Sequence, residues 1–541
     1  MLSFLAALAS GALVHIFIFR NGEWDTSAPQ IVLTYLLITL TGTFLFNETP
    51  SFNNENSVQV TPRFASLIVY HILGVYGSII VYRGFLHRLS RKEYPGPFLA
   101  RFSNFHLAWL ATKALRVHEE IHELHGRYGD YVRTGARELS IIDPEAMEAI
   151  YGSSSKCSKG PIYTLLDPRT NLSSTRDKKE HARRRKAWDR GFNTKALQSY
   201  EPIVSQLSDD LMQIIDERAG EPFNITEWID KYAFEVMGSL TFGKPFNMLK
   251  EKKNAYFLDV IRHDMNFIGY LLHSPWLSYL LMRTPLLNRN HLDFWRWIEN
   301  EFDERIQRGQ VRPDIFNWIH EAYLRGPQAK EDRLKLHGDG YLIIVAGSDT
   351  TSSTITHLLF YLSCNPSLVA RLQQQIDELP EINNSELHNV ELLDACINET
   401  LRLRPAVPAG LQRVTPKGGM QIGDRYIPSD VIVKIPMYSL FRDPRSFEQP
   451  NEFIPERFTT RPELVINPSI FAPFLTGPYA CVGRRLALME IRRVIAKILQ
   501  SYDISLGPFQ TKDGFLGKNI DAFTLVPGPL VLRFTKRAQV G

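Results

Sequence analysis

Cysteine is scarce in this chain: it has four among 541 residues, and no two of them form a Cys-x-x-Cys motif. The absence of closely spaced pairs argues against a zinc site and against the disulfide framework of a secreted domain. Strong charge is missing as well, since the net charge is +4 and charged residues make up 22% of the chain. This balance does not indicate a dedicated nucleic-acid-binding protein, so we expect no nucleic acid among the partners.

Long apolar segments are concentrated near the N-terminus, where charge is almost absent. We predict transmembrane helices at 2–19, 29–46 and 64–82, because each segment approaches the roughly 20 residues that a helix needs to cross a bilayer. A cleaved signal peptide would explain only the first segment. Core helices of a soluble domain are the alternative, but the near-absence of charge favours membrane helices. Residues 1–92 are therefore predicted to form a membrane anchor with about three transmembrane helices.

Basic residues predict the orientation of this anchor. Arg83, Arg88 and Arg91 follow the third segment, whereas residues 47–62 contain no lysine or arginine. By the positive-inside rule, the long C-terminal part faces the cytosol, while the loop 47–63 and the N-terminus face the lumen.

The rest of the chain is predicted to be mainly helical with small sheets. Two prolines around a glycine in "EYPGPF", residues 93–98, end the anchor because they cannot continue a helix. Helical periodicity covers 104–128, 176–218, 224–240, 288–306, 338–364, 366–379, 391–403 and 484–501. Strand-like segments occur at 130–142, 411–434 and 522–535.

One cysteine lies in an unusual loop, "PFLTGPYACVGRRLA", which runs from residue 473 to residue 487. Gly477 and Gly483 let the backbone bend tightly and approach a flat group. Cys481 lies just before an amphipathic helix, whose N–H groups and dipole favour a thiolate. Such a thiolate is suited to bind iron or to act as a nucleophile, and an inert buried thiol is the third alternative. The full pattern Phe-x-x-Gly-x-x-x-Cys-x-Gly is a much stronger signal than Cys-x-Gly alone.

A Glu-x-x-Arg tetrapeptide recurs at residues 180, 399 and 490, so the motif alone decides nothing. Glu399 and Arg402 share a helix face, and prolines stop that helix soon after. Arg457 in "PERF" is placed to complete a buried cluster with them through charge-assisted hydrogen bonds. A solvated surface pair is the alternative.

The longest predicted apolar helix contains "VAGSDTTSSTITHLLFYL", residues 345–362, in which a run of polar residues follows an Ala-Gly pair. Small residues let a ligand lie against the backbone, and a threonine hydroxyl can bond to the carbonyl four residues earlier and bend the helix. Ordinary back-bonding explains any one of these residues, but not Asp349 and Thr350 directly after an Ala-Gly pair.

The order of these motifs resembles the cytochrome P450 superfamily. AGSDTT, ETLR, FRDP, PERF and FLTGPYACVG follow one another between Pro95 and about Phe534. The resemblance implies that family's mainly α fold, a triangular prism of helices with small β-sheets. It also implies a haem-thiolate monooxygenase domain over 93–541, with protohaem (haem b) bound by the Cys481 thiolate. Thiolate-ligated haem iron is suited to O–O cleavage, because the sulfur pushes electron density onto the iron.

The resemblance assigns the other site residues in three groups. Asp349 and Thr350 match the family's proton-delivery pair, and the structural triad corresponds to Glu399, Arg402 and Arg457. Haem binding is implied for His181, Arg185, Ala346, Arg413, Phe474, Tyr479 and Gly483. The substrate pocket is matched by four apolar residues, Ile343, Val407, Pro408 and Leu411. The basic stretch 176–190 also suits a solvated face that meets an acidic electron donor.

Tyr479 departs from the family's common pattern, which has an arginine two residues before the cysteine. A phenol donates one neutral hydrogen bond and brings no charge, so this haem propionate contact is in doubt. The "TGPY" loop is similar to that of a fungal, microsomal-type subgroup with several membrane segments, which includes enzymes like tryprostatin B 6-hydroxylase.

The resemblance implies a hydroxylase that uses O2 and NADPH electrons, delivered by NADPH–cytochrome P450 reductase, on a lipophilic small molecule of fungal secondary metabolism. It also implies an endoplasmic reticulum membrane protein whose catalytic domain faces the cytosol, with the lipid bilayer as a partner. The alternatives are an O2-independent haem-thiolate isomerase or dehydratase, and a non-catalytic haem-binding membrane protein.

Overall fold

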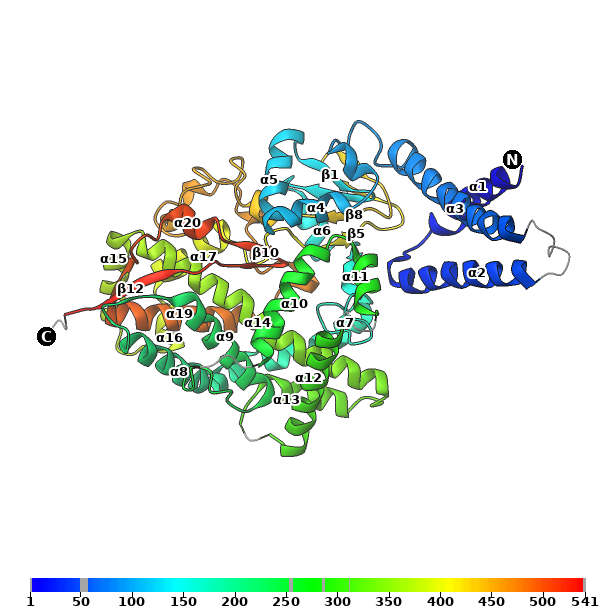
Figure 1. Ribbon diagram of the computed structural model, residues 1–541. Coiled ribbons are helices and arrows are strands. Elements are labelled where there is room, and N and C mark those ends of the chain that lie inside the picture. Colours follow the sequence, from blue (N-terminus) through cyan, green and yellow to red (C-terminus); the bar gives the residue numbers. More distant parts are fainter. Residues whose placement is uncertain (1, 49–56, 253–255, 285–287, 311, 539–541) are drawn as a thin grey trace.

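The computed structural model describes residues 2–48, 57–252, 256–284, 288–310 and 312–538 (Figure 1). Helices dominate the described chain, as the periodicity predicts. Their bounds are α1 (Leu2–Val14), α2 (Ala28–Glu48), α3 (Ser57–Val81), α4 (Phe105–Ala114), α5 (Val117–Tyr128), α6 (Ala146–Tyr151), α7 (Lys178–Gly191), α8 (Thr194–Asp216), α9 (Ile225–Phe242), α10 (Tyr256–Leu271), α11 (Pro275–Met282), α12 (Arg289–Arg308), α13 (Ile315–Leu324), α14 (Lys330–Ser363), α15 (Pro366–Asp377), α16 (Asn384–Leu387), α17 (Glu391–Leu403), α18 (Met437–Leu440), α19 (Arg484–Ser501) and α20 (Lys512–Leu516).

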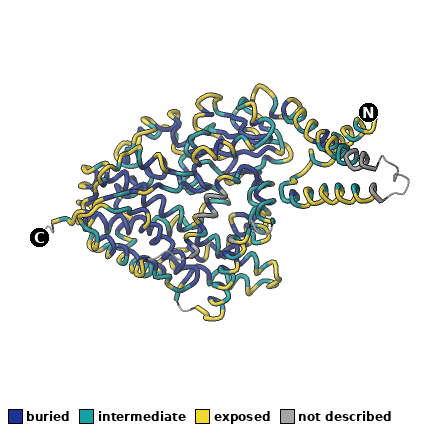
Figure 2. Tube along the Cα trace, in the orientation of Figure 1, coloured by how far each residue is buried: buried dark blue, intermediate teal, exposed yellow. Residues whose placement is uncertain are grey.

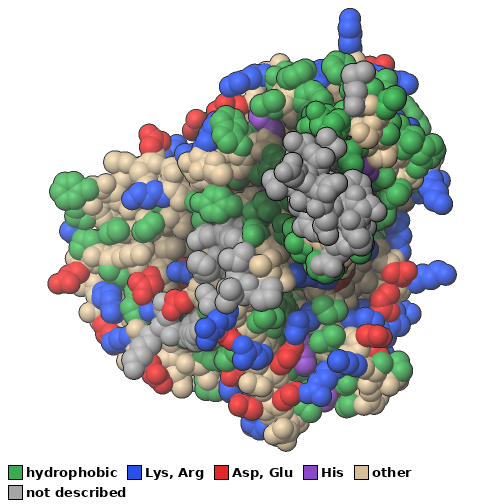
Figure 3. Space-filling model, turned by 45° about the vertical axis from the view of Figure 1, so that its right-hand side comes forward, with side chains coloured by type: hydrophobic (Ala, Val, Ile, Leu, Met, Phe, Trp, Pro, Cys, Tyr) green, Lys and Arg blue, Asp and Glu red, His purple; other side chains and the backbone are tan. Residues whose placement is uncertain are grey.

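The first three helices project from the body, as Figure 1 shows. Three segments are long and apolar enough to cross a membrane: Leu2–Phe19, Asp25–Leu45 and Phe64–Leu86. The tube of these segments is coloured mainly as exposed or intermediate in Figure 2, and hydrophobic side chains are prominent on the face that Figure 3 shows. These three apolar helices fit the predicted anchor and suggest membrane association. The loop predicted to face the lumen, 47–63, lies partly outside the described residues.

The loop between α1 and α2 contacts the body of the molecule. Glu23 forms an ion pair with Arg176, with an Nη1–Oε2 distance of 2.6 Å, and a longer one with Arg137, at 3.4 Å. The short helix Asp25–Ser27 packs against α11. The N-terminal end of α1 lies at the far end of the anchor, so this loop is on the same side of the anchor as the body (Figure 1).

The strands form small separate sheets in the described chain. One sheet has the order β1-β2-β8-β5-β3, in which β2 and β8 are parallel, and another has the order β4-β12-β9. Two hairpins, β6-β7 and β10-β11, complete the set. The bounds are β1 (Tyr131–Gly135), β2 (Glu138–Ile141), β3 (Ser158–Lys159), β4 (Pro222–Asn224), β5 (Arg413–Val414), β6 (Met420–Ile422), β7 (Arg425–Ile427), β8 (Ile432–Lys434), β9 (Tyr502–Leu506), β10 (Ile520–Ala522), β11 (Thr524–Val526) and β12 (Val531–Lys536).

The main hydrophobic core lies among the helices, and α14 runs through it. This helix packs against α9, α17 and α19, and most of its C-terminal half is buried. A second core lies between the five-stranded sheet, α6 and α18. The two helices nearest the central site motifs, α14 and α19, are therefore packed against each other.

Two predicted helices are each divided in the structure. The segment 104–128 breaks at Leu115, which has a left-handed φ of 51°, and becomes α4 and α5. The segment 176–218 breaks before α8, because Asn193 accepts a hydrogen bond from the N–H of Ala196 and caps a new helix. Hydrophobic periodicity alone does not reveal such breaks, because the helices on both sides of a break bury their apolar faces in the same core.

Candidate active site

The cysteine loop is shaped by its backbone before the helix α19. Leu475 and Gly477 have φ values of 58° and 65°, in the left-handed region. A Cβ at Gly477 would lie 2.6 Å from the carbonyl oxygen of Tyr151, so only glycine fits there. The N–H of Cys481 donates to the carbonyl of Phe474 at 2.8 Å, which closes the loop.

Cys481 lies deep in the molecule, yet its side chain is exposed to open space. Burial raises the pKa of the thiol, while the backbone N–H groups of Gly483 and Arg484 and the charge of Arg185 lower it. The N–H groups belong to the start of α19, as expected for a sulfur at a helix N-terminus. A Cβ at Gly483 would meet nothing closer than the Cys481 sulfur at 3.8 Å, so contacts within the chain do not require this glycine.

The buried stretch of α14 is interrupted at one exposed residue. Ala346 is exposed, although the residues just before it are buried in the core. Thr350 Oγ1 donates to the carbonyl of Ala346 at 2.8 Å, and Ser348 and Thr354 make the same bond to the carbonyls four residues before them. Three such bonds within seven residues turn hydroxyls back onto the helix beside a surface that a ligand can approach.

Asp349 is the acid of this stretch. Burial raises the pKa of its carboxyl to about 7, and the positive charge of Arg262 opposes that rise. Arg262 comes from α10 and forms an ion pair with Asp230 of α9. Because its pKa lies near neutrality, Asp349 can both give and take a proton at physiological pH.

Three basic residues meet beside Tyr479, and we call them the Lys159 cluster: Lys159, His181 and Arg413. Lys159 Nζ lies 4.7 Å from the centroid of the Tyr479 ring, and Arg413 Cζ lies 4.9 Å from it. The His181 ring meets the same ring edge to face at 4.6 Å. The predicted residues His181, Arg413 and Tyr479 are thus brought together, and sequence reasoning missed Lys159.

Arg185 is directed to the backbone of the cysteine loop. Its Nη1 donates to the carbonyl of Ala480 at 2.6 Å, and its Nε donates to Asp189 at 2.7 Å. A cavity of about 360 Å³ opens between α6, α7 and the cysteine loop, and its lining includes His181, Arg185 and Tyr479. The predicted basic face of α7 therefore meets the cysteine loop directly.

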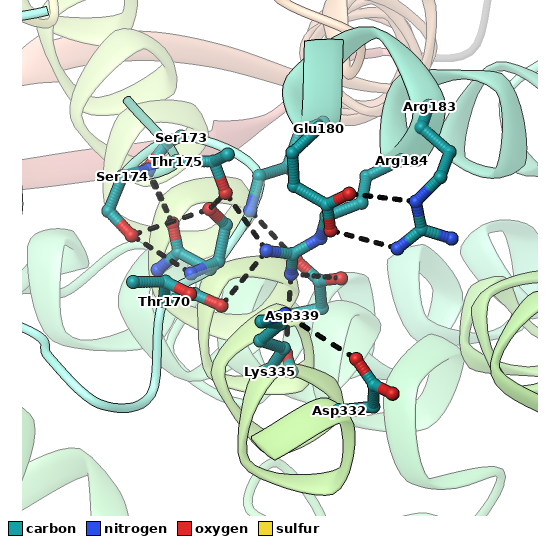
Figure 4. Close-up of polar contacts among 12 residues, drawn as sticks. Thr170, Ser173, Ser174, Thr175, Glu180, Arg183, Arg184, Asp332, Lys335 and Asp339 are labelled. Atoms are coloured by element: carbon teal, nitrogen blue, oxygen red, sulfur yellow. Dashed lines mark hydrogen bonds and ion pairs between the residues drawn. The ribbon is translucent and has the colours of Figure 1, made fainter. Parts of the chain in front are cut away.

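The neighbouring Arg184 fixes α7 to α14. It forms a buried ion pair with Asp339 at 2.6 Å and donates to Thr170 and Thr175, as Figure 4 shows. The other oxygen of Asp339 accepts from the N–H of Leu172 at 2.8 Å. This network holds the loop 170–175, whose Leu172 and Ser173 carbonyls accept hydrogen bonds from Lys159.

Glu399, Arg402 and Arg457 form a buried cluster, which we call the Glu399 cluster. Glu399 accepts two hydrogen bonds from Arg402, at 2.7 and 2.9 Å, and one from Arg457 at 3.0 Å. The remaining N–H groups of both guanidinium groups donate to backbone carbonyls, including those of Phe441 and Glu448. The side chains of Glu399 and Arg402 are 0% exposed.

The predicted pocket residues do not all face open space. Val407 and Leu411 are half-buried, as is Phe474 of the cysteine loop, whereas Pro408 is buried. Ile343 is 2% exposed and packs within the main core, one turn before the exposed Ala346. The assignment of Ile343 to the pocket stays a prediction, and its burial in the core weighs against it.

The family model for cytochrome P450 matches residues 95–534 of this chain. The chain belongs to the cytochrome P450 family. It is 70% identical to the cytochrome P450 monooxygenase orf5 of Eupenicillium brefeldianum, over 88% of this chain and 97% of the relative. It is 41% identical to the cytochrome P450 monooxygenase FCK2 of Fusarium pseudograminearum, over 97% of this chain and 96% of the relative. It is 34% identical to tryprostatin B 6-hydroxylase of Aspergillus fumigatus, over 91% of this chain and 89% of the relative.

This cytochrome P450 is an enzyme of the monooxygenase class, and membership of the family implies a haem with a thiolate ligand. The residues present fit such a group. The thiol of Cys481 and the small side chain of Ala346 are both exposed, so the described chain does not cover either of them. The buried Nε of Arg413 has no hydrogen-bond partner in the described chain, as expected for a donor that an anionic ligand completes.

Proposed function

We propose that this cytochrome P450 hydroxylates a lipophilic small molecule in fungal secondary metabolism, using O2 and electrons that NADPH–cytochrome P450 reductase delivers from NADPH. The observation that carries the proposal is the exposed thiol of Cys481 before a helix N-terminus, in a loop whose Tyr479 meets the cationic Lys159 cluster. When bound, thiolate-ligated haem iron supplies the chemistry that activates O2.

The chain's own residues hold the group and control proton access. Cys481 is the proposed iron ligand, and the N–H groups at the start of α19 would stabilise its thiolate. His181, Arg413 and Tyr479 lie where they would meet the haem edge, and Arg185 supports the loop through Ala480. Ala346, Phe474 and Gly483 are the proposed contacts with the ring faces.

Asp349 and Thr350 are the proposed proton-delivery pair. Asp349 exchanges protons near neutral pH, and the hydroxyl of the adjacent Thr350 donates to the carbonyl of Ala346. The half-buried Val407 and Leu411, backed by the buried Pro408, are the proposed apolar wall, which suits a lipophilic substrate such as an indole alkaloid or a terpenoid. The relative named tryprostatin B 6-hydroxylase supports a hydroxylation of this kind.

The three apolar helices support a location in the endoplasmic reticulum membrane, with residues 93–541 facing the cytosol. The basic residues that follow the third helix favour the same orientation.

The ligand assignment is tested by the carbon monoxide spectrum of the reduced protein. The wild type should show the thiolate-type band, and Cys481→Ala should abolish it. Cys364→Ala is the matched control, since Cys364 is also an exposed thiol but follows the C-terminal end of α14. A thiolate band that survives in Cys481→Ala would show that another group holds the iron.

The reaction class is tested by measuring whether NADPH and O2 are consumed as product forms. Their consumption together with substrate separates a monooxygenase from an O2-independent isomerase and from a non-catalytic haem protein. Thr350→Ala should release peroxide at the expense of product, because its hydroxyl controls proton access. Unchanged coupling between NADPH oxidation and product would remove that role from Thr350.

A further inference from the structure

Two buried cations face each other across a strand pair at the edge of the site. In the β3–β5 ladder, Lys159 is the direct partner of Arg413. Their exposed fractions are 2% and 1%. Like charges directly opposite each other destabilise a strand pair, and burial increases the cost because water cannot screen them.

No carboxylate of the described chain balances this pair. Burial and the charges of Arg413 and Arg184 together lower the pKa of Lys159 to about 6. The influences on His181 are likewise burial and neighbouring cations, among them Lys159 and Arg185. The neighbouring Arg184 and Arg185 form ion pairs with Asp339 and Asp189. In the described chain, the Lys159 cluster has no such acidic partner.

The hydrogen-bond donors of the cluster are also incompletely used. An ammonium group has three N–H donors, and Lys159 gives two of them to the carbonyls of Leu172 and Ser173, at 3.1 and 2.6 Å. Arg413 donates to Gln412 and Tyr163, but its buried Nε has no acceptor among the described residues. Each of the two facing cations thus retains a donor for a further acceptor, and a carboxylate matches both in charge and in geometry.

Tyr479 explains why a lysine is tolerated at this place. Its ring receives both Lys159 and Arg413, at 4.7 and 4.9 Å from the centroid. An arginine at position 479 would add another buried cation to a pair that already repels. A neutral ring instead offers its negative face to both cations.

We propose that Lys159, together with Arg413, binds a haem propionate and supplies the charge that an arginine at position 479 provides in the common family pattern. The proposal rests on the haem-thiolate function proposed above. In this chain the positive charge lies on strand β3 instead of the cysteine loop, and the carbonyls of Leu172 and Ser173 hold Lys159 there. Lys159 is therefore a cofactor-positioning residue.

The test measures haem release from the purified full-length holoenzyme to an excess of apomyoglobin. Lys159→Met should release haem about tenfold faster than the wild type, because one charge-assisted hydrogen bond is lost. Lys179→Met is the control: it removes an exposed lysine from α7 and should release haem at the wild-type rate. An unchanged release rate in Lys159→Met would overturn the proposal.

A second variant tests the exchange of positions directly. Tyr479→Arg, added to Lys159→Met, should slow haem release at least threefold, because the charge returns to the cysteine loop. Should Lys159→Met alone incorporate no haem, the double variant should restore incorporation, and failure to do so would overturn the proposal.

The carbon monoxide spectrum of the wild type is recorded first. A missing thiolate band contradicts the proposed function, whereas a wild-type-like release rate in Lys159→Met contradicts only the role of Lys159.

Discussion

The Glu399 cluster and the Lys159 cluster are both buried and rich in cations, but they differ in what completes them. Glu399 bonds both of its arginines, and backbone carbonyls accept from the rest of their donors. Lys159 and Arg413 face each other without an acid, and the Nε of Arg413 stays unpartnered in the described structure. The first cluster is complete as protein alone, whereas the second is complete only with an anion.

This difference separates residues that hold the fold from residues that hold a ligand. A buried guanidinium with a carboxylate and carbonyl partners stabilises one packing of the chain. A buried cation without them costs stability until a ligand supplies the missing charge. Whether the N–H donors of a buried cation all have acceptors within the protein, rather than whether the residue is lysine or arginine, indicates if it holds the fold or a ligand.

The largest expected effect comes from removing the acid of the complete cluster. Glu399→Gln leaves the guanidinium groups of Arg402 and Arg457 buried without a counter-charge, which should cost about 3–5 kcal/mol of stability. We expect little folded protein and almost no haem incorporation, measured as the thiolate-type carbon monoxide band per unit of protein. A normal yield of that band would mean that the cluster adds little to the fold.

Arg413→Met should have a different effect, because it removes a cation from the incomplete cluster. This variant should fold and show the thiolate-type band, but lose haem to apomyoglobin tenfold faster or more. Arg402→Met is the matched comparison, and it should fail to accumulate as folded protein. If both variants behaved alike, the distinction between the two clusters would be wrong.

Haem retention should also depend on pH through Lys159. Without an anion nearby, burial and the charges of Arg413 and Arg184 lower the pKa of Lys159 from 10.5 to about 6. A bound propionate favours the charged form, so haem binding takes up a proton above about pH 6. Haem affinity should therefore fall, and release should quicken, as pH rises from 6 to 9, by at most about tenfold per unit.

The same pH series in Lys159→Met should be flatter, since the titrating group is gone. His181 does not interfere in this window, because burial and the neighbouring cations lower its pKa to about 4. A rise in release with pH that survives in the variant would have to arise elsewhere.

The smallest expected effect comes from the Glu-x-x-Arg pair on α7. Arg183 donates two hydrogen bonds to Glu180, both at 2.8 Å, yet the Arg183 side chain is 60% exposed. Glu180→Gln should change the free energy of unfolding by no more than about 0.5 kcal/mol, since solvent screens such pairs. Thermal unfolding of the holoenzyme measures this, and a loss approaching that of Glu399→Gln would contradict the role of burial.

The three copies of Glu-x-x-Arg show how far the sequence could lead. The same Glu-x-x-Arg pattern occurs at 180, 399 and 490. Of the three glutamates, only Glu399 accepts hydrogen bonds from two buried arginines, Arg402 and Arg457. Glu490 is buried with an unpartnered Oε2, and burial raises the pKa of its carboxyl well above the ordinary value. The order of motifs identified the copy at 399, because prolines and "PERF" follow it. The spacing within the tetrapeptide could not distinguish the three copies.

The fold class and the family were predictable, because helical periodicity and the order of motifs are properties of the local sequence. Helices 391–403 and 484–501 agree with α17 and α19 at both ends. Lys159 was not found, since β3 is only two residues long and its partner Arg413 lies far along the chain. Long-range pairing of so short a strand leaves no periodic signal, and the same limit applies to Arg262, which reaches Asp349 from α10.

The contact between Glu23 and Arg176 links the anchor to this chemistry. Arg176 bonds the anchor loop through Glu23, and its Nε donates to the carbonyl of Lys159 at 3.1 Å. The body is thus joined to the anchor at two places, by the covalent segment after α3 and by this loop. A chain cut before residue 93 would lose Glu23 and, with it, the ion-pair partner of the arginine that bonds the backbone of Lys159.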